Sequence, residues 1–197
     1  WISTIKELIA STDSHTLLDY GSGKGLQYQN LLLEDKNKSR YRGLQDYWKL
    51  DEVYCYDPAY PPYQRFPEKQ YDAVISMDVL EHCPQEDIKW IVDEIFSLAK
   101  KFVFINVACY PADRLLPNGE NAHCTVRPGV WWEKILQSII LDYPDVMYCF
   151  LAEYFYFDVV QKKRIFQILS NFDGVAGGVQ VDSPVMSILE KTWLQVN

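Results

Sequence analysis

Cysteine is scarce in this chain and is spread without a pattern. The chain has five cysteines, and none of them forms a C-x-x-C pair. An odd number without such pairs argues against a disulfide framework and against a structural zinc site. We therefore expect reduced thiols, a cytoplasmic location and no metal site.

Basic residues are also in the minority: 19 Lys and Arg stand against 27 Asp and Glu, which gives a formal net charge of −8. Nucleic-acid binding needs clustered cations, so this composition argues against a nucleic-acid partner. Apolar runs are short, and none approaches the ~20 residues of a membrane-spanning helix. The partner we expect is a small molecule, with no nucleic acid and no membrane; the oligomeric state is left open.

Hydrophobic residues, in contrast, make up 48% of the 197 positions, and aromatic residues make up 15%. A chain of this length can bury one sizeable core, so we expect a single domain over residues 1–197. Its expected parts are an N-terminal helix at 1–14, a core at 15–162 and a C-terminal extension at 163–197. In the extension, the helical spacing of Val185, Ile188, Leu189 and Trp193 predicts one more helix.

Stretches typical of strands and of helices alternate along the chain. That order predicts an α/β fold with a mostly parallel sheet. The expected strands are residues 16–20, 52–56, 72–77, 102–107, 146–152 and 154–160, and the expected helices are residues 2–11, 25–35, 130–141 and a segment that begins at Pro84. Four prolines between Asp57 and Asp72 oppose both helix and strand, so one edge of the sheet should be short.

The most informative segment is residues 17–25, which read L-L-D-Y-G-S-G-K-G. An apolar strand ends in Asp19 and runs into three glycines. Such a turn builds a nucleotide site, because glycine allows a tight bend and a close ligand. The segment is not a phosphate-binding P-loop, and the dinucleotide fingerprint would need glycine where Leu26 stands. A nicotinamide-dependent oxidoreductase and a turn without any ligand are the alternatives.

Two later segments extend this motif. Asp57 follows the strand at 52–56, and an acid at that place accepts hydrogen bonds from ribose hydroxyls. An ordinary turn before Pro58 is the alternative explanation. The strand at 72–77 then runs into Asp78 and Val79. With this order and spacing, the three segments resemble the motifs of class I S-adenosylmethionine-dependent methyltransferases, from about residue 15 to about residue 160.

The resemblance implies a Rossmann-like sandwich whose last strand is antiparallel, S-adenosyl-L-methionine as the cofactor, and methyl transfer as the reaction. The cofactor-binding residues that it implies are Asp19, Gly21, Ser22, Gly23, Asp57, Pro58, Asp78 and Val79. The proline-rich segment departs from the family, whose members place a helix and a third strand there, so we expect the third-strand edge to be shortened. A protein that binds the cofactor without catalysis is a further alternative.

A long loop follows the strand at 102–107. In open α/β sheets ligands bind beyond the carboxyl ends of the strands, so this loop should border the methyl acceptor. Its residues 116–132 read L-P-N-G-E-N-A-H-C-T-V-R-P-G-V-W-W. This segment resembles a stretch of bacterial methyltransferases near polysaccharide and surface-glycan genes, which implies capsule or polysaccharide biosynthesis. The acceptor-binding residues we expect are Tyr110, Arg114, Asn121 and Arg127.

The two arginines of this loop indicate an anionic acceptor, such as a phosphorylated or nucleotide-linked sugar or metabolite, methylated on a hydroxyl or an amine. Salt bridges to Glu120 or Asp113 are the alternative for them. A hydroxyl acceptor would need a general base. His123 in the loop and His82 beyond the strand at 72–77 are the candidate catalytic residues. For His82 the alternative is a bond to the backbone at a helix start.

Overall fold

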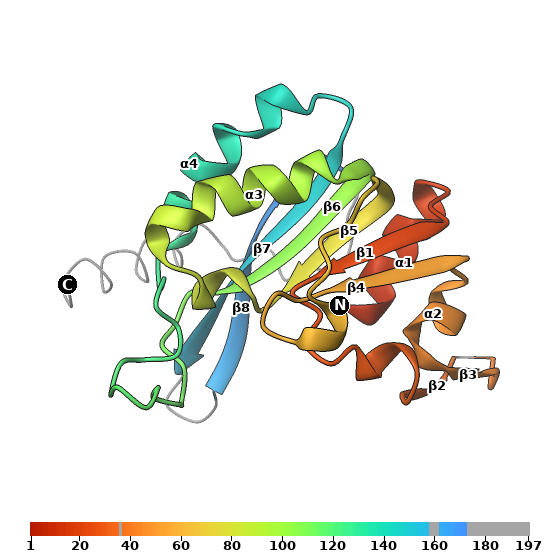
Figure 1. The fold of residues 1–197 in the computed structure, drawn as a ribbon, viewed down its shortest axis with the longest axis horizontal. Coiled ribbons are helices and arrows are strands. Elements are labelled where there is room, and N and C mark those ends of the chain that lie inside the picture. Colours follow the sequence, from red (N-terminus) through yellow and green to blue (C-terminus); the bar gives the residue numbers. More distant parts are fainter. Residues whose placement is uncertain (36, 158–161, 173–197) are drawn as a thin grey trace.

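A six-stranded sheet forms the centre of the molecule (Figure 1). The computed structural model describes residues 1–35, 37–157 and 162–172. The strands of the sheet are β1 (Thr16–Tyr20), β4 (Glu52–Tyr56), β5 (Tyr71–Met77), β6 (Ala99–Ala108), β7 (Met147–Phe157) and β8 (Lys162–Ser170). They lie in the order β4-β1-β5-β6-β7-β8, and all neighbours are parallel except the final pair, β7 and β8. The expected α/β fold with a mostly parallel sheet and an antiparallel last strand is confirmed.

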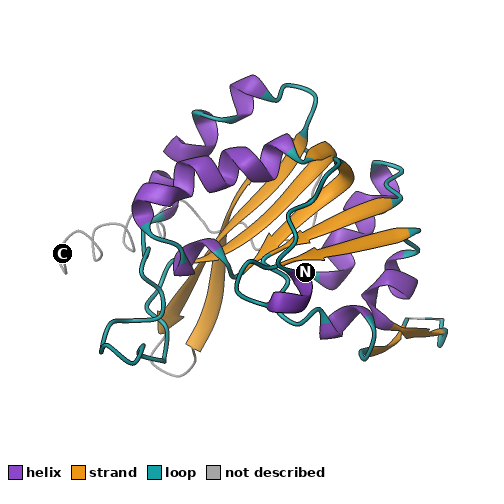
Figure 2. Ribbon diagram, in the orientation of Figure 1, coloured by secondary structure: helices purple, strands orange, loops and turns teal. Residues whose placement is uncertain are grey.

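Helices cover both faces of this sheet (Figure 2). The first layer contains α1 (Ile2–Ser11) and α2 (Gly43–Trp48), and the second contains α3 (Ile88–Ser97) and α4 (Gly129–Gln137). Successive side chains of a strand point to opposite faces. In β6, Phe102 and Phe104 therefore pack in the first layer, while Val103 and Ile105 pack in the second. A continuous apolar run is what a strand buried on both faces requires.

The prediction of a helix at residues 25–35 is wrong. Only a 3₁₀ turn forms there, at Leu26–Tyr28, and a hairpin of β2 (Leu32–Glu34) and β3 (Arg40–Arg42) follows it. Gly43 explains the fold-back. Its N–H donates to the carbonyl of Leu31 at 2.6 Å, and a Cβ on it would lie 1.9 Å from the carbonyl oxygen of Tyr28. The chain can approach itself this closely only at glycine.

The two strands expected at 146–152 and 154–160 are one strand, β7, and the last strand is β8. The division was placed at Glu153, a charged residue in an aromatic run. Glu153 stays in register with Ala108 of β6 and Phe166 of β8, because its buried carboxylate has partners of its own. The sheet thus continues past residue 162, where the predicted core ended. The helix expected near residues 185–193 lies outside the described residues.

The proline-rich segment contributes no strand, as the sequence predicted. Residues 57–70 run as a loop with one 3₁₀ turn at Pro61–Tyr63, and β4 is the edge of the sheet. Two other helices differ slightly from expectation. The segment after Pro84 starts with a 3₁₀ turn at Gln85–Asp87 before α3 begins, and α4 ends at residue 137, with a 3₁₀ turn at Ile140–Asp142 after it. In the part of the chain that the structure describes, no helix has the length and apolar character needed to cross a membrane.

Candidate functional site

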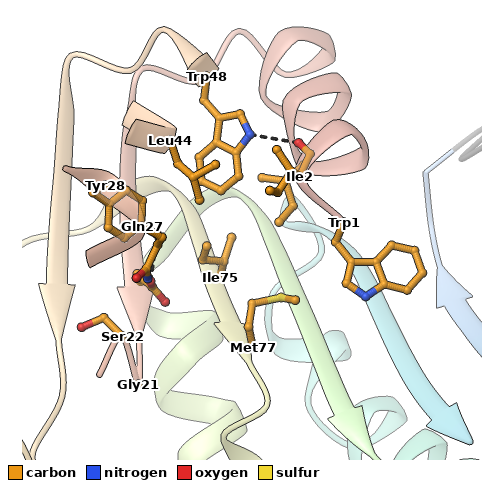
Figure 3. A pocket seen from close by; sticks show the side chains of 12 residues that line it. Trp1, Ile2, Gly21, Ser22, Gln27, Tyr28, Leu44, Trp48, Ile75 and Met77 are labelled. Atoms are coloured by element: carbon orange, nitrogen blue, oxygen red, sulfur yellow. Dashed lines mark hydrogen bonds between the residues drawn. The ribbon is translucent and has the colours of Figure 1, made fainter. Parts of the chain in front are cut away.

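The carboxyl ends of β1, β4, β5 and β6 meet at one edge of the sheet, where three adjacent hollows open. The α3 hollow, about 480 Å³, reaches the side chains of α3. The α1 hollow, about 260 Å³, lies beside α1 and α2 (Figure 3). The β6 hollow, about 290 Å³, lies at the end of β6. Shared lining residues join them: Gly21 borders the α1 and α3 hollows, Asp78 the α3 and β6 hollows, and Trp1 the α1 and β6 hollows.

The glycine turn after β1 fits tightly between the two neighbouring strands. The Gly21 N–H donates to the carbonyl of Tyr56 at 2.8 Å. Gly21 has φ +85°, and a Cβ on it would lie 2.4 Å from a methyl carbon of Val79. Gly23 has φ +57°, but a Cβ there would meet nothing within 4 Å. Only the first of these two glycines is therefore required by packing, and the second stands beside open space.

Asp57 ties the end of β4 to this turn. Its Oδ2 accepts the Gly23 N–H at 2.8 Å, and its Oδ1 accepts the Ala59 N–H at 2.8 Å. The residue lines the α3 hollow together with Pro58. A carboxylate offers about four acceptor positions, so two remain for a ligand in the hollow.

Asp19 is buried beneath the same turn and lines the α1 hollow with Ser22. Its Oδ2 accepts from Gln27 Nε2 at 3.0 Å and from the Tyr28 hydroxyl at 2.8 Å. Burial raises the pKa of the Asp19 carboxyl to about 6, although both hydrogen bonds act in the opposite direction. Ionisation of Asp19 therefore lowers the free energy of unfolding of the protein.

We expect Asp19→Asn to raise the stability of the free protein at pH 7 by about 2–3 kcal/mol. An asparagine oxygen can keep both hydrogen bonds and carries no charge to desolvate. Because the folded pKa lies above the ordinary value of 3.8, stability falls as pH rises from about 4 to about 6. Urea unfolding at pH 4 and pH 7 tests this: the gain should fall to about 0.5 kcal/mol at pH 4. Asp51→Asn, at an exposed acid, is the control, and an equal gain at both pH values would contradict the argument.

The end of β5 is held by a residue of β6. Asp78 has φ +55°, its N–H donates to the Asn106 carbonyl at 3.1 Å, and its Oδ1 accepts from Asn106 Nδ2 at 2.6 Å. Asp78 lines both the α3 hollow and the β6 hollow. Val79, the next residue, packs under the Cα of Gly21. All the expected cofactor residues except Gly23 line the α1 or the α3 hollow, and Gly23 bonds to Asp57.

The β6 hollow contains two buried acids that sequence reasoning missed. Glu81 is fully buried, its Oε1 accepts the Ala108 N–H at 3.1 Å, and burial raises the pKa of its carboxyl to about 7. Glu153 accepts from the Tyr110 hydroxyl at 3.2 Å and from Arg164 Nε at 2.9 Å. A signal was present for Glu153, as it was for Asn106, because each is a polar residue inside an apolar strand. Nothing in the sequence distinguishes Glu81 from an exposed acid.

The two candidate histidines contact each other from adjacent hollows: His123 lines the β6 hollow, and His82 lines the α3 hollow. Their rings are T-shaped with centroids 4.7 Å apart. His82 Nδ1 lies 2.8 Å from the Ala122 carbonyl oxygen, and His123 Nδ1 lies 2.7 Å from the Tyr110 carbonyl oxygen. A carbonyl only accepts, so each Nδ1 carries a hydrogen, and each neutral ring keeps its lone pair on Nε2. For His82 the backbone bond expected as the alternative is observed, while a catalytic role stays a prediction.

The remaining loop residues are placed differently from one another. Tyr110 lines the β6 hollow. Asn121 instead holds the loop together, because its Oδ1 accepts the N–H groups of Ala112 and His123, both at 2.9 Å, and its Nδ2 donates to the Ala112 carbonyl. Arg127 donates to the Gln85 side chain, and Arg114 is exposed. Neither arginine borders the three hollows, and within the described ranges neither forms the ion pair with Glu120 or Asp113 that was the alternative.

The lining of the hollows is acidic. Asp19 borders the α1 hollow, and Asp57, Asp78 and Glu94 border the α3 hollow. Among the residues that the structure describes, no Lys or Arg lines either of these two hollows. The β6 hollow has one arginine, Arg164, already paired with Glu153. The charge of this edge favours a ligand that is cationic or neutral over one that carries phosphate groups.

No protein-family model, curated protein or solved structure matches this chain. An α/β fold of this kind hosts many unrelated functions, so the fold by itself selects none of them. The residues and charges at the carboxyl edge of the sheet are what a functional hypothesis has to explain.

Proposed function

We propose that the chain transfers a methyl group from S-adenosyl-L-methionine to a small acceptor. The observation that carries the proposal is the lining of the α1 and α3 hollows on either side of the glycine turn, which is acidic and to which the described part of the chain contributes no arginine or lysine. S-Adenosylmethionine bears a sulfonium and an ammonium group and no phosphate, so negative potential favours it. Buried Asp19 lies on one side of the turn and Asp57 on the other.

The same edge argues against a nicotinamide cofactor. A dinucleotide places its diphosphate at the start of an α-helix, where N–H groups and the helix dipole attract anions. Here the glycine turn leads into a three-residue 3₁₀ turn, Leu26–Tyr28, which is too short to supply that field. The acids Asp57, Asp78 and Glu94 would also repel the diphosphate.

The acceptor, in this proposal, enters the β6 hollow, with an attacking hydroxyl or amine next to Tyr110 and His123. The cofactor supplies an activated methyl, so the protein has to align the acceptor with the S–CH₃ bond and take up a proton. A lone pair on Nε2 of His123 or His82 suits that second task. An anionic part of the acceptor would contact Arg114 or Arg127 on the outer loop, because Asp78, Glu81 and Glu153 surround the hollow itself.

Ligand-dependent thermal stability tests the cofactor. S-Adenosylhomocysteine at 100 times its dissociation constant should stabilise the fold by about 2.7 kcal/mol, and NAD at the same concentration should not. A shift with NAD alone would favour the oxidoreductase. A screen of phosphorylated sugars, nucleotide-linked sugars and phosphorylated metabolites for a mass gain of one methylene then separates an enzyme from a protein that only binds the cofactor.

Asp57→Ala is expected to weaken S-adenosylhomocysteine binding roughly 10- to 100-fold, since hydrogen bonds to a charged group contribute about 1.5–3 kcal/mol. Calorimetric titration measures the change. Asp51→Ala is the matched control, because Asp51 is an exposed acid that precedes β4 as Asp57 follows it. Equal affinities of the wild type and a folded Asp57→Ala variant would remove Asp57 from the cofactor site.

A further inference from the structure

Three ligand-type side chains from two separate segments converge where the β6 hollow adjoins the α3 hollow: Glu81 and His123 line the first, and His82 lines the second. Glu81 and His82 lie in the 3₁₀ turn Leu80–His82 after β5, and His123 lies in the loop after β6. One carboxylate oxygen of Glu81 and one nitrogen of each imidazole all lie within 4.8 Å of one another. Two ligands of a tetrahedral zinc ion are roughly 3.4 Å apart. The three groups therefore need only a small inward movement to share one ion.

The hydrogen bonds of the two imidazoles direct the Nδ1 atoms to the backbone and leave the Nε2 atoms for a metal. Each Nδ1 is committed to a backbone carbonyl, of Ala122 for His82 and of Tyr110 for His123. Metal-binding histidines commonly donate their second nitrogen to a carbonyl in this way, which fixes the tautomer and the ring orientation. The lone pairs on the two Nε2 atoms are thus available for a shared ligand.

Independently of the cluster, two buried oxygen atoms of this hollow have no hydrogen-bond partner among the described residues. Glu81 is fully buried, and its Oε2 has no hydrogen-bond partner among the described residues; the same is true of Oδ1 of Asn106. Both residues line the β6 hollow. Buried acceptors are normally satisfied, and a carboxylate oxygen left without a donor is among the most costly to bury. A cation beside Glu81 would remove that cost.

The acidic side chains around the cluster also favour a bound cation. Asp78 and Glu153 also line the hollow, and Arg164, the one cation that the described residues contribute there, is paired with Glu153 through its Nε. The sequence had predicted no metal site, because the cysteines are scattered. The present cluster uses no cysteine, and its members stand too far apart in the chain to form a recognisable motif.

We propose that Glu81, His82 and His123 bind one divalent transition-metal ion of the zinc type, with at least one coordination position left open to the hollow. Imidazole nitrogens suit such ions, and two histidines with one carboxylate leave room for an exogenous ligand. The binding itself does not depend on the proposed methyl transfer. If both hold, a hydroxyl of the acceptor would occupy the open position, and the ion, in place of a histidine base, would lower the pKa of that hydroxyl.

Cobalt(II) and zinc(II) are the probes. After treatment with a chelator and removal of it, the full chain should bind one equivalent of zinc by calorimetry, and cobalt should give a visible absorption band that zinc abolishes. Loss of an outer partner of a metal ligand costs about 10- to 100-fold in affinity, so loss of a ligand should cost at least roughly 100-fold. We expect that for His82→Ala, His123→Ala and Glu81→Gln.

His15→Ala is the matched control. His15 is an exposed histidine that lies 3.3 Å from Asp13 and 3.4 Å from Asp51, so it is the place where an adventitious ion would bind. Its replacement should leave the stoichiometry and the affinity unchanged. Circular dichroism establishes that each variant is folded, and Glu81→Gln, which keeps size and shape, tests the site without a cavity.

The proposal is overturned if the wild type binds no zinc, or if zinc affinity is unchanged in both His82→Ala and His123→Ala; loss of binding in His15→Ala would then place the ion at His15. S-Adenosylhomocysteine is absent from these titrations. A chain that binds zinc but not S-adenosylhomocysteine would therefore keep the metal site and lose the proposed methyltransferase function, and the opposite result would leave the histidines as proton acceptors.

Discussion

Gly23→Val is expected to weaken binding of S-adenosylhomocysteine by at least roughly 100-fold, a loss of about 2.7 kcal/mol or more, while the chain stays folded. A Cβ at Gly23 would meet no protein atom within 4 Å, so the fold bears only the strain of φ +57°, about 1–2 kcal/mol. The added side chain would occupy the space beside Asp57 into which the cofactor is proposed to enter, and it would disturb the Gly23 N–H that Asp57 accepts. Calorimetric titration, with unfolding by urea on the same sample, measures both quantities.

Gly119→Val is the matched control for backbone strain. Gly119 also has a positive φ, +87°, and open space around its Cβ position, but it lies in the loop after β6 and borders none of the three hollows. Its replacement should cost similar stability and leave cofactor affinity unchanged. Gly21→Val is expected to fail differently, by loss of the fold, because its Cβ would collide with Val79. Equal cofactor affinity in the wild type and in Gly23→Val would refute the proposed role of the turn.

The parts of the fold that could be predicted are those with a strong hydrophobic period. The run at 102–107 and the spacing of Ile88, Ile91, Val92 and Ile95 each have one structural solution, a doubly buried strand and an amphipathic helix. The segment after Gly25 was misassigned because Leu31–Leu33 is too short an apolar run to distinguish helix from strand. The close approach of Gly43 to Tyr28, a contact between residues far apart in sequence, decided in favour of the hairpin.

The residues of the candidate site also divide into those that the sequence could predict and those that it could not. Asp19, Asp57 and Asp78 could be placed together from the sequence, because the carboxyl ends of adjacent parallel strands share an edge. The role of Asn121 could not, since only the folded loop shows that its amide bonds Ala112 and the His123 N–H. Glu81 was missed for a related reason. Its burial raises the pKa of its carboxyl, and that burial depends on β6, β7 and the loop after β6, which are distant in sequence.

His123→Ala is expected to give the largest effect on turnover, roughly 10²- to 10⁴-fold, with cofactor affinity near that of the wild type. The side chain contacts Tyr110 and His82, and among the described residues it forms no hydrogen bond or ring contact with a residue proposed to bind the cofactor. The loss should therefore appear in kcat with the acceptor found by the methyl-transfer screen, and not in the dissociation constant of S-adenosylhomocysteine. Arg114→Ala, at the outer face of the loop, should instead raise the KM of an anionic acceptor and leave kcat unchanged.

Two further histidine variants complete this test: His15→Ala is the control, and His82→Ala changes the second candidate catalytic residue. His15 precedes β1, and its side chain lies near Asp13 and Asp51, away from the loop after β6. Its loss should therefore change neither kcat nor the dissociation constant of S-adenosylhomocysteine. His82 holds the Ala122 carbonyl and faces the His123 ring, so its loss should lower kcat as well. Wild-type kcat in both His82→Ala and His123→Ala would mean that the acceptor reacts outside the β6 hollow. In that case the buried acids Glu81 and Glu153 would not serve methyl transfer, and the zinc titration would test their role independently.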